Sequence, residues 1–73
     1  MNKEEVLIVT FSSLEDALEM DALDLDGRLI PVPNVVKAGC GQCFMSKNLD
    51  DAYWKMVLNR ENISYEQIVK VVF

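Results

Sequence analysis

The residues best able to do chemistry in this chain are two cysteines, Cys40 and Cys43, which bracket a Gly-Gln pair. The chain has no histidine, so a serine or cysteine nucleophile has no imidazole base, and a metal ion lacks its commonest nitrogen ligand. The three glycines, at positions 27, 39 and 41, match no phosphate-binding loop. Acidic residues fall on predicted helix faces and in a turn. Covalent chemistry is therefore expected at residues 40–43.

The two cysteines have different neighbours in the sequence. Cys43 is followed by two large apolar residues and is typical of a structural cysteine, which packs as a small hydrophobe. Cys40 lies between Gly39 and Gly41, which leave its sulfur accessible and expose backbone N–H groups. A thiolate near such donors is stabilised and becomes a better nucleophile. Lys37 is the nearest basic residue in the sequence and is a candidate supporting charge.

Four interpretations of this segment stay open on the residues alone. Both cysteines could be structural. They could form a redox dithiol, although in an extended segment residues i and i+3 point to opposite faces, so a disulfide would need a local turn. They could supply half of a tetrahedral zinc site, with the other ligands from a second chain. Finally, Cys40 alone could carry a sulfur or selenium atom as a persulfide or its selenium analogue, which needs an accessible thiol but no histidine or cofactor.

Composition limits the class of protein. A chain of 73 residues with 51% apolar residues is expected to form one globular domain over residues 1–73. The net charge of −5 and the scattered basic residues argue against nucleic acid and anionic membranes as partners. The charged N-terminus, the lack of a long apolar run and the low cysteine content predict a cytoplasmic protein with reduced thiols. Its acidic surface suits a basic protein partner or solubility alone.

Hydrophobic patterning predicts four strands and two helices. The strands are expected over residues 6–11, 28–33, 40–45 and 67–73. A capping-box pattern at Ser12 and Ser13 predicts a helix that ends near Leu23, and Asn48 is the expected cap of the second helix, with Asn62 as its left-handed C-terminal residue. The expected inner stripe of the first helix is Leu14, Ala17, Leu18, Ala22 and Leu25. That of the second is Leu49, Ala52, Tyr53, Met56 and Val57, widened by Trp54 and Leu58.

The order strand, helix, strand, strand, helix, strand predicts an α+β fold of the ferredoxin-like kind, an antiparallel sheet with two helices on one face. The run at 6–11 is apolar throughout and should be central in the sheet. Pro31 and Pro33 lie in the second predicted strand and should place it at a sheet edge, because proline cannot donate to a ladder. Another two-layer α+β sandwich with the same elements is the alternative.

Particular segments carry a resemblance that covers nearly the whole chain. They are Phe11-Ser12-Ser13, the Ala17-Leu18 pair, Pro31-Val32-Pro33, Ala38-Gly39-Cys40-Gly41 and Ile63-Ser64-Tyr65. With these segments the sequence resembles the family described as putative selenium/sulfur carrier protein-like. The Pro-x-Pro segment followed by the Cys-Gly pair is the specific part of the resemblance.

The resemblance implies that Cys40 is the thiol that carries the chalcogen, with no metal or cofactor. A cysteine desulfurase or selenium-delivery enzyme is then the expected donor, and another protein the acceptor. Gly39 and Gly41 would give access and backbone donors, and the Pro31 and Pro33 segment would hold the loop rigidly. Cys43, where the family commonly has a small apolar residue, would be auxiliary or resolving.

Two departures from the family pattern bear on this site and its surroundings. Asn34 follows Pro33 where a basic residue is common, and the first helix is about one turn shorter than usual. The rival hypothesis from another class is a protein-interaction or regulatory module without covalent chemistry. Such a module would use a proline-free edge strand, such as the C-terminal one, and is compatible with a homodimer. A thiol–disulfide redox protein is the other alternative.

Overall fold

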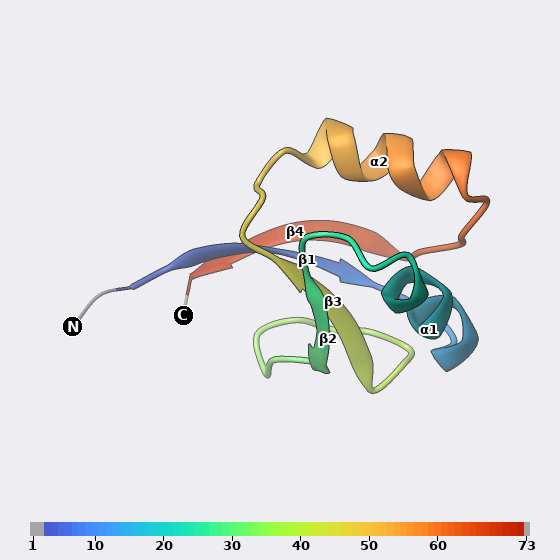
Figure 1. The fold of residues 1–73 in the computed structure, drawn as a ribbon. Helices are drawn as coiled ribbons and strands as arrows, with labels where there is room; N and C mark the ends of the chain where they lie inside the picture. The colour runs from blue at the N-terminus through green and yellow to red at the C-terminus, as the bar shows by residue number, and fades with distance from the viewer. Residues whose placement is uncertain (1–2, 73) are drawn as a thin grey trace.

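The computed structural model describes residues 3–72 and has one four-stranded antiparallel sheet and two helices (Figure 1). The elements follow the chain as β1 Glu5–Thr10, α1 Leu14–Ala22, β2 Arg28–Pro31, β3 Gln42–Ser46, α2 Asp51–Arg60 and β4 Gln67–Val72. The strands lie in the order β2-β3-β1-β4. This is the arrangement of a ferredoxin-like sandwich, so the predicted α+β fold is confirmed.

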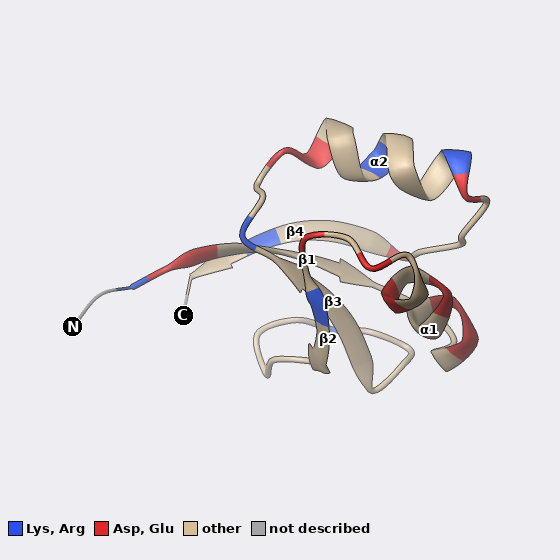
Figure 2. Cartoon of the chain, in the orientation of Figure 1, with Lys and Arg blue, Asp and Glu red and all other residues tan. Residues whose placement is uncertain are grey.

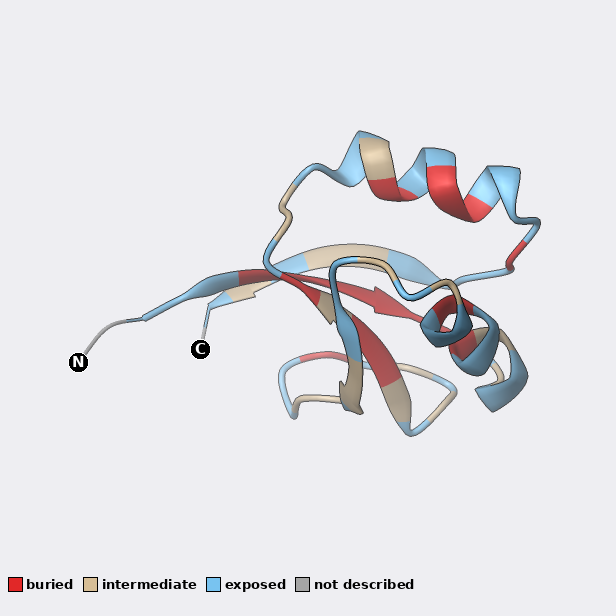
Figure 3. Cartoon of the chain, in the orientation of Figure 1, coloured by how far each residue is buried: buried red, intermediate tan, exposed pale blue. Residues whose placement is uncertain are grey.

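The central strand is β1, as its continuous apolar run predicted. Residues from Val6 to Val9 are all buried, and Figure 3 shows buried residues along β1 and the middle of β3. Leu7 and Val9 belong to the core on the helix side of the sheet, together with Phe44 and Trp54. Val6 and Ile8 pack with Cys43 in a second cluster on the opposite face. The sheet therefore has two apolar faces to cover.

The proline-bearing strand β2 lies at the sheet edge, as predicted. It ends at Pro31, although the backbone N–H of Val32 still donates to the carbonyl of Gly41 at 3.3 Å. The third strand begins at Gln42, so the prediction that it starts at Cys40 was wrong. Cys40 belongs instead to the preceding loop, because its N–H bonds to Phe11 rather than to β2. The predicted end of the last strand at Phe73 lies outside the described residues.

Helix α1 starts where the sequence predicted, and its inward face is only partly the predicted one. Ser13 is its N-cap and accepts the backbone N–H of Asp16 at 3.3 Å. Of the predicted inner residues, Ala17 is buried and Leu25 packs partly buried against the core. Leu14, Leu18 and Ala22 are exposed, contrary to prediction, and Met20 is buried instead. The sequence has apolar residues on both stripes of this helix, so periodicity alone could not choose between them.

Helix α2 starts later than predicted. Its N-cap is Asp50, whose side chain accepts the N–H of Tyr53 at 3.2 Å. Asn48 lies in the turn before it, where its carbonyl accepts the indole N–H of Trp54 at 2.9 Å, so the prediction of Asn48 as the cap was wrong. Asn62 has the predicted left-handed backbone, with φ at 56°.

The buried face of α2 combines Val57, which was predicted in the inner stripe, with Trp54 and Leu58, which were expected only to widen that stripe. Trp54, Val57 and Leu58 are buried, and the Trp54 ring packs edge-on against Phe44 at 5.1 Å between centroids. Ala52 and Met56 are exposed, contrary to prediction. The bulky indole takes the central position because it fills the space above Phe44 and finds a hydrogen-bond partner for its N–H.

A ten-residue loop between β2 and β3, residues 32–41, lies over the sheet face opposite the helices (Figure 1). The carbonyl of Pro33 accepts the N–H of Val36 at 3.0 Å, which closes a turn within the loop. Val36 is buried, and the segment around it faces β4, with Val69 and Val71 lining the same hollow. The loop thus starts at one edge of the sheet, reaches β4 and returns to β3.

Replacing Gly27 by alanine is expected to destabilise the fold. A Cβ at this position would overlap the Phe44 ring and would lie 2.6 Å from the carbonyl oxygen of Met45. We expect a loss of at least about 2 kcal/mol in the free energy of unfolding, because neither the core ring nor the strand backbone can move away cheaply. Urea denaturation measures it.

The matched control is Gly41→Ala. An added Cβ there meets no atom within 4 Å, and the backbone has no positive φ, so the stability should change by less than about 1 kcal/mol. Equal stability of the Gly27→Ala and Gly41→Ala variants would contradict the packing described here.

Candidate functional site

Cys40 lies where four elements meet at one end of the sheet. Its backbone N–H donates to the carbonyl of Phe11 at 3.0 Å, and Phe11 connects the end of β1 to the start of α1. Two residues later the chain enters β3, and Glu66, just before β4, lies beside Gly39. The Cys40 side chain is partly buried against the helix-side core and partly exposed to solvent. It is therefore a fixed but accessible thiol.

Two side chains at the beginning of β4 hold the loop that carries Cys40. The Glu66 carboxylate accepts the N–H of Gly39 at 2.8 Å, and the Gln67 amide donates to the carbonyl of Lys37 at 3.1 Å. Glu66 is itself held by its own N–H, which donates to the carbonyl of Thr10 at 2.7 Å. We call Glu66 and Gln67 the β4 clamp. Together with the Phe11 bond, the clamp fixes the backbone on the N-terminal side of the cysteine.

The Cys40 sulfur has one backbone donor and an open side. Its Sγ accepts the N–H of Gln42 at 3.4 Å. Gly41, between them, is exposed and has open space where a side chain would project. The N–H of Gly39 points to Glu66 rather than to the sulfur. Of the contributions expected from the two glycines, the structure shows the open space at Gly41. The backbone N–H that donates to the sulfur belongs to Gln42 rather than to a glycine.

Cys43 lies on the other side of the sheet and is fully buried. It pairs with Thr10 of β1 and Ile30 of β2 and packs with Val6 and Ile8. Burial, and to a smaller extent negative charge on Cys40, together raise the pKa of its thiol to about 11. Both cysteines are free thiols. The two cysteine side chains therefore face opposite sides of the sheet, as predicted. The Cys43 thiol is protonated and shielded from solvent.

The other predicted supporting residues occupy different places. Pro31 ends β2 opposite Gln42, next to the entry of the cysteine loop into β3. Pro33 lies further along and closes the turn to Val36. Lys37 is exposed, and its carbonyl is bound by the clamp, but no hydrogen bond joins its ammonium to Cys40 within residues 3–72.

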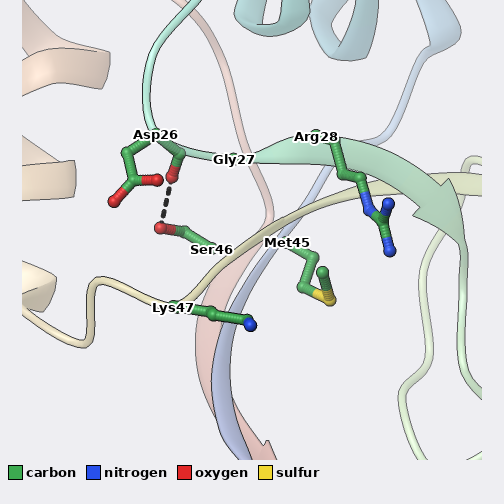
Figure 4. Close-up of a pocket in the computed structure, with 6 residues that line it drawn as sticks. All are labelled: Asp26, Gly27, Arg28, Met45, Ser46 and Lys47. Carbon is green, nitrogen blue, oxygen red and sulfur yellow. Dashed lines mark hydrogen bonds between the residues drawn. The ribbon is translucent and has the colours of Figure 1, made fainter.

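Two surface hollows in the described part of the chain are lined by residues other than the cysteines. One, of about 320 Å³, lies at the far end of β2 and β3 and is shown in Figure 4. There the buried hydroxyl of Ser46 donates to the carbonyl of Asp26, and Lys47 forms an exposed ion pair with Glu4 at 3.2 Å. The other, of about 470 Å³, separates the loop from β4.

Among residues 3–72, no group of three or more His, Cys, Asp or Glu side chains is arranged to hold a metal ion. No helix formed by these residues is both long and apolar enough to cross a membrane.

Helix α1 and the turn that follows it are acidic. Figure 2 shows acidic residues along α1 and in the turn after it, with no Lys or Arg among them. Six of the twelve acidic residues of the chain lie between positions 15 and 26. They are Glu15, Asp16, Glu19, Asp21, Asp24 and Asp26. A macromolecule that approaches from this side meets a negative field.

The fold and site define a small ferredoxin-like domain with a single accessible thiol at the end of its sheet. Residues 6–70 match the family described as "Putative Se/S carrier protein-like". The match spans most of the chain and includes every element that positions Cys40, so the chain belongs to this family. Comparison with curated proteins and with solved structures found no match to the chain.

Sequence reasoning missed the β4 clamp. Glu66 lies 27 residues from Gly39 along the chain, and Gln67 lies 30 residues from Lys37. Neither belongs to a motif, and both stand where a strand was expected to begin. Only the pairing of β4 with β1 brings them to the cysteine loop.

Removing the clamp carboxylate should loosen the loop without unfolding the domain. In Glu66→Ala the N–H of Gly39 loses its acceptor, so we expect faster hydrogen–deuterium exchange at Gly39, by about tenfold for a lost bond of roughly 1.4 kcal/mol. In Glu66→Gln the amide oxygen still accepts this bond and exchange should stay near the wild-type rate. Unchanged exchange in Glu66→Ala would show that the clamp does not hold the loop.

Stability should fall at high pH because of Cys43. Its folded-state pKa of about 11 lies above the ordinary value of 9.0, so between these values the folded state binds more protons than the unfolded state. The contribution of the Cys43 thiol to the free energy of unfolding is therefore fully present below pH 9, and it is lost as the pH rises toward 11. The free energy of unfolding of wild type relative to Cys43→Ala should drop by about 2 kcal/mol from pH 7.5 to pH 10.5. A difference independent of pH would contradict the burial of this thiol.

Proposed function

We propose that this protein carries a sulfur or selenium atom on Cys40 as a persulfide or its selenium analogue, and passes it from a donor protein to an acceptor. The observation that supports this most directly is the contrast between the two thiols. Cys40 is accessible and has a backbone donor at its sulfur, whereas Cys43 is buried with a raised pKa. Membership of the carrier-like family agrees with this assignment.

Loading requires only a sulfur exchange at Cys40. The Cys40 thiolate attacks the outer sulfur of a donor persulfide, the new sulfur–sulfur bond forms as the donor's bond breaks, and the donor thiolate leaves and takes up the proton. Unloading reverses the roles: a nucleophile of the acceptor attacks the outer atom, and Cys40 leaves as a thiolate. No net oxidation occurs in either step. With selenium the outer atom changes and the electron count does not.

The geometry of Cys40 suits this exchange. The N–H of Gln42 at the sulfur stabilises the thiolate, both as attacking group and as leaving group. The open space at Gly41 leaves room for the extra atom and for the approach of a donor. The fixed backbone on either side holds the sulfur in one place, which reduces the entropy lost when two proteins align their reacting atoms.

Cys43 is poorly placed to resolve the persulfide. Attack by a second thiol on the inner sulfur, the Cys40 Sγ, would form a disulfide and release the outer sulfur as hydrogen sulfide, which would end the carrier cycle. Here the second thiol lies across the sheet, buried and protonated. A disulfide between Cys40 and Cys43 would require Gly41 and Gln42 to leave their places beside β2. This separation favours the carrier hypothesis over the redox hypothesis.

Mass spectrometry tests the proposal. Reduced protein incubated with a cysteine desulfurase and cysteine should gain one sulfur, about 32 Da, which a reductant removes. Cys40→Ser should gain none, and Cys43→Ala should load as wild type does. Alanine is the better control at position 43, because a serine hydroxyl would be buried in an apolar cluster.

Three outcomes would count against the proposal. Equal loading of Cys40→Ser and wild type would place the sulfur elsewhere. A loss of two hydrogens would indicate a disulfide between the two cysteines and thus a redox protein. A failure to load with both the desulfurase and inorganic polysulfide would favour an interaction module without covalent chemistry.

A further inference from the structure

Helix α1 has an apolar stripe that faces solvent. Leu14 and Leu18 are 51% and 52% exposed, and Ala22, one turn further along, is exposed as well. Residues four apart follow one another along the same side of a helix, so these three form a continuous ridge, which we call the α1 ridge. The inward side of the helix is already occupied by Ala17 and Met20. The ridge is thus an apolar face that no other part of residues 3–72 covers.

The α1 ridge starts next to the reactive thiol. Its first residue, Leu14, follows the N-cap Ser13. Two residues before that cap, the carbonyl of Phe11 is bound by the backbone N–H of Cys40. Gly39 also lies close to the backbone of Ser12, since a Cβ on Gly39 would be 3.4 Å from the Ser12 Cα. A protein seated on the ridge would therefore reach Cys40 without any rearrangement of the fold.

The acidic residues beside the α1 ridge restrict which molecules can bind to it. Glu15 and Glu19 are exposed and flank it, because each follows a ridge leucine by one residue and is turned about 100° around the helix. No basic residue occurs in α1. A second copy of this chain, with its net charge of −5, would set acid against acid across the ridge. Nucleic acid and anionic lipid would be repelled for the same reason. A protein with an apolar patch rimmed by Lys or Arg is complementary.

We propose that the α1 ridge is the docking surface for the persulfide-bearing donor protein, whose matching surface has an apolar centre and a basic rim. This inference rests on the proposed carrier function. Burial of two leucines supplies affinity, and the acidic flanks attract and orient the partner. Docking along α1 aims the donor persulfide at the open side of Cys40. The face that contributes nothing to the core of the free domain thereby acquires a role in recognition.

Two sulfur donors separate docking from the chemistry at Cys40. A persulfidated cysteine desulfurase is a protein donor, and sodium polysulfide is a small one that needs no docking surface. We expect Leu14→Ser/Leu18→Ser to reduce the rate of loading from the desulfurase by about tenfold or more, with the polysulfide rate unchanged within about twofold. The control is Met56→Ser on α2, which removes a similarly exposed apolar side chain, 47% exposed, outside the ridge.

A charge series gives a second, independent readout. Loading from the desulfurase should slow as sodium chloride is raised, and Glu19→Lys should weaken this salt dependence. Glu5→Lys, which reverses an exposed charge at the start of β1, is the matched control and should behave as wild type. The single variant Leu18→Ser keeps the test available if the double variant is unstable to urea.

The outcomes are distinct. Equal desulfurase rates for wild type and the folded ridge variants would overturn the docking proposal while leaving the carrier function intact. So would a desulfurase that fails to load wild type when polysulfide succeeds, because the ridge would then not serve that donor. Failure of both donors on wild type would instead remove the carrier function, and the docking proposal with it.

Discussion

The two-sided burial of β1 is the constraint on which the rest of this structure depends. With Val6, Leu7, Ile8 and Val9 all buried, both faces of the sheet need an apolar cover, but the two helices cover only one. The loop of residues 32–41 lies over the other face, where Val32 packs against Val6 and Ile8 and Val36 is buried near β4. Because the loop must then return to β3, it passes the end of β1, where Phe11 and Glu66 bind its backbone. The position of Cys40 is a consequence of how the sheet is covered.

The same arrangement separates two thiols that lie three residues apart. Cys43 is already part of β3 and points into the loop-side cluster, so it loses water and stays protonated. Cys40 precedes the strand and stays at the surface, with its backbone held and its sulfur accessible. A domain of this size has little interior to spare for an enclosed active site. Exchange of a sulfur atom at an exposed thiol needs no such cavity.

Charge and apolar surface act together around this thiol. Acidic residues from Glu15 to Asp26 lie along α1 and the turn after it, on the same helix that exposes Leu14 and Leu18. An apolar ridge flanked by acidic residues binds selectively. Burial of its leucines provides affinity, and the negative charge beside them repels acidic partners. On this view the exposure of Leu14 and Leu18 is useful because the core is complete without them.

Local sequence patterns were sufficient to predict the order of elements, the central position of β1 and the edge position of β2. They also distinguished the glycine-flanked Cys40 from the apolar-flanked Cys43. Each of these follows from local properties: β-branched runs, the missing N–H of proline, and the side-chain preferences next to each thiol. The tertiary structure decided the inward face of α1, the cap of α2, the loop position of Cys40 and the β4 clamp. These depend on pairings between distant segments.

Helix α1 has two apolar stripes, and its local sequence does not favour one of them for burial. Packing against Phe44 and its neighbours selects Ala17 and Met20 over Leu14 and Leu18. Likewise, nothing near Glu66 in the sequence indicates Gly39, because the antiparallel pairing of β4 with β1 is what brings them together.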